Sequence, residues 1–170
     1  VIPTIDTELQ VLAQHKAVFL AQGITLVVSS SNFIRQCRDK RLTNLLFTQL
    51  GLPVPHTYAV ENIVFPCFAK PIAGSLSQNI RILSCQAELD SWPIDKAAMM
   101  FMEIVPATDF DEFTIDIYFD QLSELKCIVP RQRLEVRGGE VSKALTVKSL
   151  VQLIKPFMEQ LQGAFGCITL

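Results

Sequence analysis

The apolar stretches of this chain are no longer than one β-strand, and this limits it to a fold of short strands and a few helices. Five such stretches follow one another from residue 64, and the segment RLEVRGGEVSKA continues them with Gly138 and Gly139 at its centre. Short β-rich runs separated by turn residues predict strands, and the glycine pair predicts a hairpin. The predicted strands cover residues 64–70, 79–83, 97–105, 112–119 and 124–130.

Helical patterns occur at residues 6–23, 39–50, 84–92 and 147–162. The first helix can be capped by Asp6 or Thr7 and stops at Gly23, and the second follows Asp39 and stops at Gly51. A β-rich run at residues 24–28 follows the first helix, an order typical of the last unit of a doubly wound sheet. The sequence therefore predicts an α/β tail followed by an α+β fold with hairpins.

Composition excludes several classes of protein. The 170 residues are 49% hydrophobic with a formal net charge of −2, and no basic tract suggests nucleic acid as a partner. The apolar runs are too short to cross a membrane. Five scattered cysteines indicate reduced thiols, which predicts a cytoplasmic protein with no zinc site and no disulfide framework. The chain begins without methionine and stops at the strand-like GAFGCITL, so we expect it to be a piece of a longer protein.

Two lysines occupy positions that favour an anion site. Lys70 ends the apolar run that begins at Ile63, and Pro71 and a small-residue loop over 73–77 follow it. A cation beside flexible backbone donors can hold phosphate. Lys40 lies in the first turn of a predicted helix, where a positive charge opposes the macrodipole unless an anion is present. Exposed surface lysines are the alternative at both positions.

Paired charges mark two later strands. Glu112 and Asp116 share one face of a predicted strand, which can be a solvated face or can accept hydroxyl groups and position lysines. Arg131 and Arg133 also share a face and repel each other unless anions join them. They indicate either an anion site or a charged edge strand.

The order of these motifs resembles the ATP-grasp family, closest to its carbamoyl-phosphate-synthase-like branch. The motifs are Asp39-Lys40 before an amphipathic helix, then GLPVPHT, FPCFAKPIAGSLSQNI, MEIV, DEFTIDIYFD and VPRQRLEVRGGEVSKA. VIPTIDTEL resembles the tail of the preceding domain in that branch. The resemblance covers nearly the whole chain and implies an ATP-grasp fold of two α+β subdomains over residues 39–170. It further implies that residues 1–38 are the tail of a Rossmann-like domain.

The resemblance also implies the roles of individual residues. Lys40 and Lys70 match the lysines that bind ATP phosphates, and Glu112 matches the acid that binds the ribose. Arg131 and Arg133 are our candidates for the acyl-phosphate or substrate side. Gly74, Ser75 and Ser77 match the mobile loop that covers the phosphates in the family. Met102, Glu103, Ile104 and Val105 match the hinge, whose backbone groups hold adenine. Asn79 replaces a loop glycine of the branch, and asparagine tolerates a positive φ better than most residues.

The implied chemistry is ligation, in which ATP phosphorylates a carboxylate and an amine or another nucleophile attacks the acyl phosphate. ATP and Mg²⁺ are the expected cofactors, and the family's metal ligands are expected beyond Leu170. One alternative is a non-catalytic or regulatory nucleotide-binding module. Another is a plain structural α+β domain that binds no nucleotide.

Overall fold

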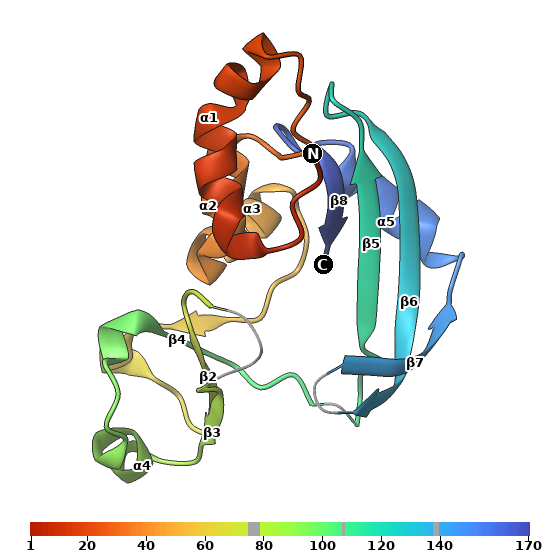
Figure 1. The fold of residues 1–170 in the computed structure, drawn as a ribbon. Helices are drawn as coiled ribbons and strands as arrows, with labels where there is room; N and C mark the ends of the chain where they lie inside the picture. Colours follow the sequence, from red (N-terminus) through yellow and green to blue (C-terminus); the bar gives the residue numbers. More distant parts are fainter. Residues whose placement is uncertain (75–78, 107, 138–139) are drawn as a thin grey trace. The chain divides into compact units, whose positions relative to one another are not determined.

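The computed structural model describes residues 1–74, 79–106, 108–137 and 140–170. Two compact units form, each with one four-stranded antiparallel sheet (Figure 1). We call residues 38–110 the central unit. Residues 1–37 and 111–170 together make the other, which we call the flanking unit.

The central unit has a sheet with the strand order β1-β4-β2-β3. Its strands are β1 (Thr57–Tyr58), β2 (Cys67–Pro71), β3 (Arg81–Leu83) and β4 (Met99–Met102). Its helices are α3 (Lys40–Gln49), α4 (Gln86–Ser91) and the 3₁₀ turns η2 (Val60–Asn62) and η3 (Lys96–Ala98). β2 begins three residues after the predicted start because Pro66, which has no N–H to give to a ladder, directly precedes it.

Buried residues lie on both faces of this sheet. α4 contacts β3 and contributes Leu89 to a core on one face, which also buries Cys67, Ala69, Leu83, Met99 and Phe101. The opposite face buries Met100 and Met102 with Ile72 and the half-buried Phe68. Lys70 pairs with Met100 across the β2–β4 ladder, so its side chain belongs to this second face.

Helix α3 confirms the prediction made from its end signals. The Asp39 carboxylate accepts a hydrogen bond from the Arg41 amide at 2.9 Å, which caps the first turn. Gly51 follows the last turn with φ of 82°, a conformation that glycine adopts without steric cost. Asn79 has φ of 55°, a left-handed conformation that asparagine tolerates better than most residues.

The flanking unit has a sheet with the order β7-β6-β5-β8. Its strands are β5 (Phe113–Phe119), β6 (Leu125–Arg137), β7 (Glu140–Thr146) and β8 (Gly166–Thr169). Its helical elements are η1 (Asp6–Glu8), α1 (Leu9–Ala21), α2 (Ser31–Arg38) and α5 (Leu150–Met158). The β6–β7 hairpin is confirmed, and its predicted turn at Gly138-Gly139 lies outside the described residues.

The two faces of the flanking sheet differ in polarity. Ile117 and Phe119 of β5 are fully buried, and α5 contacts the neighbouring strand β6. The alternate residues of β5 and β6 carry carboxylates and guanidinium groups on the other face. Alternation between an apolar and a polar face is the pattern expected for an antiparallel sheet covered on one side.

Residues 24–28, predicted as a strand, join no sheet among the described residues. The segment is instead bonded to the first residue of the chain: the Val1 amino group donates to Thr25 O at 2.7 Å, and Val27 N donates to Val1 O at 2.9 Å. Leu26 and Val28 are buried against Ile34 of α2. Their apolar character therefore reflects core packing, and the assignment of residues 1–38 to a preceding Rossmann-like domain stays a prediction.

Hydrogen bonds join residues 1–37 to residues 111–170, the two segments of the flanking unit. The Ser29 hydroxyl donates to Phe165 O at 3.3 Å and accepts from Phe165 N at 3.0 Å. Ser30 N donates to Gly163 O at 2.7 Å. A Cβ on Gly163, which has φ of 80°, would lie 2.3 Å from Ser30 Oγ. Only glycine fits at this position.

Helix α2 was not predicted, although Ser30 Oγ accepts from Phe33 N at 3.2 Å and so caps it. Its two buried residues, Phe33 and Ile34, are too few to form a periodic pattern. None of the helices in the described residues has the length and apolarity that crossing a membrane would take.

Candidate functional site

Lys70 stands at the end of β2 on the half-apolar face that also carries Phe68 and Met102. Its side chain is half-buried, and within the described part of the chain no carboxylate pairs with it. Burial lowers the pKa of Lys70 below its usual range, and the charge of Lys40 lowers it further. The ammonium group is therefore held in a place where its charge is costly.

Lys40 joins the start of α3 to the loop after β2. Its amide donates to Ile72 O at 3.0 Å, and its ammonium group donates to Gly74 O at 3.1 Å. Burial and the neighbouring Arg38 lower the pKa of Lys40, and Asp39 opposes them. The charge of Lys40 thus adds to the cost of the charge on Lys70, and a bound anion would reduce this cost.

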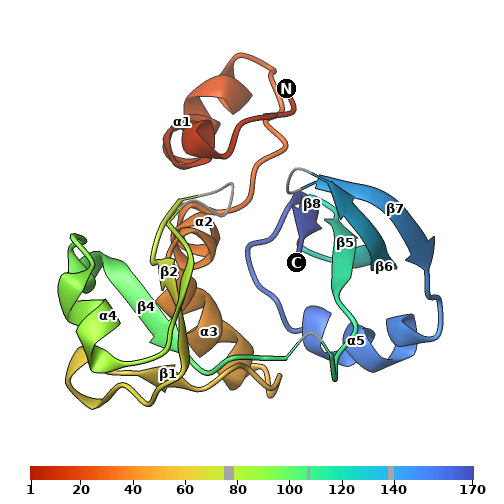
Figure 2. The ribbon, with the colours of Figure 1, turned by 90° about the horizontal axis from the view of Figure 1, so that it is seen from below.

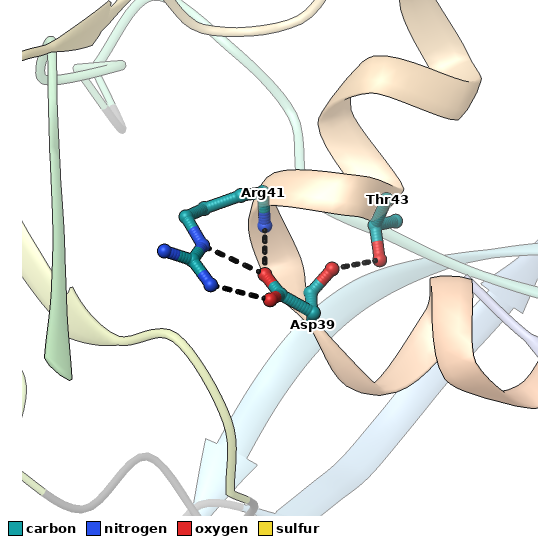
Figure 3. Close-up of polar contacts among 3 residues, drawn as sticks. All are labelled: Asp39, Arg41 and Thr43. Atoms are coloured by element: carbon teal, nitrogen blue, oxygen red, sulfur yellow. Dashed lines mark hydrogen bonds and ion pairs between the residues drawn. The ribbon is translucent and has the colours of Figure 1, made fainter.

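Asp39, the carboxylate next to Lys40 in the sequence, is bound to a different cation. Figure 3 shows Asp39 bound by Arg41, whose Nε and Nη2 donate to the two carboxylate oxygens at 3.1 and 2.7 Å. Thr43 Oγ1 donates to Asp39 O at 3.2 Å. The side-chain hydrogen bonds from Arg41 lower the pKa of the Asp39 carboxyl. Asp39 neutralises Arg41 and caps the helix, so the two lysines keep their excess positive charge.

The loop after β2 begins with Gly74, which has φ of 111° and open space around its Cα. Its carbonyl accepts the Lys40 hydrogen bond, so this end of the loop is tied to α3. Ser75 and Ser77, the other predicted phosphate-loop residues, lie outside the described residues.

The predicted hinge starts where β4 leaves the core. Met102 is 4% exposed, Glu103 is exposed, and Val105 is 51% exposed. Glu103 also contacts the segment before β1: its amide donates to His56 O at 2.9 Å, and its Oε1 accepts from His56 N at 2.8 Å. Since Met102 pairs with Phe68, the hinge begins two residues along the ladder from Lys70.

A pocket of about 410 Å³ lies beside this hinge, and the sequence did not indicate it. Its lining joins one side of α3 to the segment before β1 and includes the side of the hinge that carries Glu103. The lining residues are Arg41, Asn44, Leu45, Thr48, Val54, Pro55, His56, Thr57 and Glu103. The signal that could have identified it is the polar spacing of positions 41, 44 and 48 on one side of α3.

In the flanking unit, the two predicted arginines form ion pairs with the two predicted acids. Arg133 Nη1 lies 2.5 Å from Glu112 Oε1, and Arg131 Nη2 lies 2.6 Å from Asp116 Oδ2. Thr169 Oγ1 of β8 donates to the second oxygen of Asp116 at 2.9 Å. The anions that pair with the arginines are therefore the side chains of Asp116 in β5 and of Glu112, the residue before β5.

The predicted site residues thus form two groups. Lys40, Lys70, Gly74 and the hinge over 102–105 belong to the central unit, and Glu112, Arg131 and Arg133 belong to the flanking unit. Among the described residues, no three His, Cys, Asp or Glu side chains gather closely enough to hold a metal ion.

Comparison with known structures identifies the fold. The chain is similar to the biotin carboxylase domain of Hydrogenobacter thermophilus 2-oxoglutarate carboxylase, in complex with MgADP, ADP and bicarbonate, with a TM-score of 0.73 at 14% identity over 99% of this chain. It is also similar to Campylobacter jejuni biotin carboxylase in a β,γ-ATP complex, with a TM-score of 0.70 at 13% identity over 99% of this chain. A third is N5-carboxyaminoimidazole synthetase from Staphylococcus aureus with ADP, with a TM-score of 0.69 at 12% identity over 92% of this chain.

The chain spans 43%, 44% and 46% of the length of these three proteins, in that order. No family model matches it, and no curated protein is similar to it in sequence. The structural likeness shows that the chain has the ATP-grasp fold, which confirms the fold predicted from its motifs.

Proposed function

We propose that this chain is the nucleotide-binding part of an ATP-dependent carboxylate–amine ligase. The observation that carries the proposal is that the half-buried Lys70 lies near the charge of Lys40, whose ammonium group donates to Gly74 O at the start of the loop after β2. Within the described residues neither has a carboxylate of its own to neutralise it, and Asp39 is engaged by Arg41. Phosphate groups would supply the missing negative charge.

The central unit supplies the binding groups in a suitable order. Lys70 lies at one end of the surface formed by Phe68 and Met102, and the hinge backbone leaves the sheet at the other end. In the proposed complex the base lies on this apolar surface and the phosphates lie at the two lysines. The loop that begins at Gly74 would cover the phosphates, with Ser75 and Ser77 contributing to it.

For the flanking unit we propose that Glu112 binds the ribose hydroxyls and that Arg131 and Arg133 bind the acyl phosphate or the carboxylate substrate. Each arginine already has a carboxylate partner, so substrate binding would exchange one anion for another. Such an exchange requires little additional desolvation, because Arg131 and Asp116 are each more than one third exposed.

Mg²⁺ would neutralise part of the charge on the transferring phosphoryl group. Two observations support nucleotide and metal as the ligands: similar structures hold ADP or MgADP, and the lysine pair has the charge to bind phosphate. We assign Lys40 and Lys70 to the phosphates of the nucleotide.

Calorimetric titration of the chain with ADP, with and without Mg²⁺, tests the proposal. We expect saturable binding that weakens as salt increases, because two lysines supply the attraction. Inorganic phosphate should bind more weakly than ADP, since it cannot use the apolar surface. Absence of binding by either nucleotide form would contradict the proposal and favour a structural domain.

A second candidate is a module that binds nucleotide without transferring phosphate. The observation that favours it is the internal pairing of Arg131 with Asp116 and of Arg133 with Glu112, which neutralises these two guanidinium groups without a substrate. An assay of ADP release with a panel of carboxylates and amines separates the two. Nucleotide binding without substrate-dependent ADP release would favour the module, and turnover would favour the ligase.

A further inference from the structure

The pocket beside α3 is lined by other residues than those that we assign to the nucleotide. Its volume of about 410 Å³ falls within the range of roughly 300–1,000 Å³ that is usual for small-molecule sites. The lining comes from α3, from residues 54–57 at the start of β1 and from Glu103, all within the central unit. Lys40, Lys70 and Phe68 are not part of this lining. A ligand in the pocket would therefore be held by a different set of groups.

One part of the lining offers hydrogen-bond donors and a positive charge. Arg41 donates to the Asp39 carboxylate through Nε and Nη2, and among the described residues its Nη1 has no acceptor. The amide nitrogen of Asn44, one turn further along α3, is buried and has no hydrogen-bond partner in the described part of the chain. A buried donor without a partner costs free energy, which an acceptor in the pocket would reduce once the amide turns toward it. A carboxylate fits here because it accepts hydrogen bonds and pairs with a guanidinium group.

Glu103 brings a negative charge to the same lining. Its Oε1 accepts from His56 N at 2.8 Å, and within the described residues no donor is bonded to Oε2. The ion pairs found among the described residues do not include this exposed carboxylate. A carboxylate with a free oxygen is a suitable partner for an ammonium group.

The rest of the lining is partly apolar. Leu45 follows Arg41 by four residues, so both lie on one side of α3, and its side chain is 53% exposed. Val54 and Pro55 are half-buried. An aliphatic group in the pocket would remove part of this surface from water, which favours binding. The lining therefore combines a cation, an anion and an apolar surface.

We propose that this pocket binds a small zwitterion, a free amino acid or a dipeptide with aliphatic side chains. Its carboxylate is bound by Arg41 and Asn44, its ammonium group by Glu103, and its side chain lies against Leu45 and Val54. A zwitterion suits the site because each of its charges meets an opposite charge and the central unit gains no net charge. The inference does not depend on nucleotide binding, since neither Lys40 nor Lys70 lines the pocket.

The first test varies the ligand, by calorimetric titration of the chain. L-leucine has its two charges on neighbouring groups, and L-leucyl-L-leucine has them at its two ends. N-acetyl-L-leucine lacks the ammonium charge, and L-leucinamide lacks the carboxylate. We expect the better of the two zwitterions to bind about ten- to a hundredfold more tightly than either blocked form, the effect of one charge-assisted hydrogen bond. Which zwitterion binds better distinguishes an amino-acid site from a dipeptide site.

The second test assigns each charge of the ligand to its residue. Arg41→Gln should abolish the discrimination against leucinamide and keep that against N-acetyl-leucine, and Glu103→Gln should do the reverse. Neither change removes a contact that the fold needs. The main-chain amide at position 41 still donates to Asp39, and Glu103→Gln keeps an oxygen that can accept from His56 N.

Matched controls are Arg81→Gln and Glu61→Gln, which remove an exposed charge of each sign from the same unit and should keep both preferences. Equal binding of the zwitterions and their blocked forms by the unsubstituted chain would overturn the inference, and so would the failure of both zwitterions to bind. A loss of equal size for every ligand in Arg41→Gln would show that this residue only stabilises α3, and would overturn it too. The titration with ADP tests the proposed function separately, so the two can fail independently.

Discussion

Lys70 of the central unit and Arg133 of the flanking unit both stand on four-stranded antiparallel sheets, and they differ in what surrounds their charge. Arg133 is paired with Glu112 on the neighbouring strand, and Arg131 is paired with Asp116. Lys70 has another cation, Lys40, as its charged neighbour, and burial lowers its pKa. One sheet neutralises its positive charges internally, and the other leaves them for a ligand.

This difference indicates which of the two groups was arranged for binding. A protein loses stability when it holds like charges together in a partly buried place, so such an arrangement is expected at functional sites. An internally neutralised pair on a solvated sheet face needs no ligand to explain it. The lysine pair is therefore the stronger evidence for an anion site, although the sequence marked both groups alike.

The largest expected effect is on ligand binding. Lys70→Ala removes a charge-assisted contact to phosphate, worth about 1.5–3 kcal/mol, so nucleotide affinity should fall roughly ten- to a hundredfold. Lys148→Ala, which removes an exposed lysine of the flanking unit, is the matched control. Calorimetric titration measures both. Equal affinity in the two variants would remove the distinction between the lysine pair and ordinary surface lysines.

The next effect is on stability: removing a positive charge should destabilise the flanking unit but not the central unit. Arg133→Ala leaves Glu112 without its partner and should lower the stability of the flanking unit by about 0.5–1 kcal/mol, because the pair is partly exposed. Lys70→Met keeps the apolar stem and removes an unfavourable charge, so the central unit should become no less stable. Hydrogen exchange of β5 and β6 reports the first change. Fluorescence of Trp92, the single tryptophan of the chain, reports the second.

The smallest effect is on pH dependence. Because the folded-state pKa of Lys70 lies below its usual value of 10.5, the unfolded chain binds more protons between these two values. The stability of the central unit should therefore rise with pH in that window, whereas nucleotide affinity should fall as the lysines lose their charge. Denaturant titrations followed by Trp92 fluorescence measure the first trend. A rise of the same size in Lys70→Met would show that another group causes it.

The sequence predicted what local signals determine. Asp39 and Gly51 define the two ends of α3, and the apolar run before Lys70 defines β2, so both lysines could be placed on their elements. The alternation of β5 and β6 likewise showed that two acids and two arginines share faces.

Contacts between distant residues could not be predicted in the same way. The pairing of Arg133 with Glu112 depends on the register of two strands, and the bond from His56 to Glu103 joins residues 47 positions apart. For residues 24–28 a local signal gave a wrong prediction. Their pattern favours a strand, but Leu26 and Val28 are buried in a core and the segment joins no sheet among the described residues.

The hydrogen bonds between Ser29 and Phe165 limit the order in which this chain can fold. These residues are 136 positions apart, and the central unit lies between them in the sequence. On a ribosome, Ser29 and Ser30 leave the exit tunnel long before Gly163 and Phe165 are made. The central unit, a compact unit over residues 38–110, can form in the meantime. Leu26 and Val28 can already pack against Ile34, whereas Ser29 and Ser30 remain without their bonds to Phe165 and Gly163 until these residues have been made.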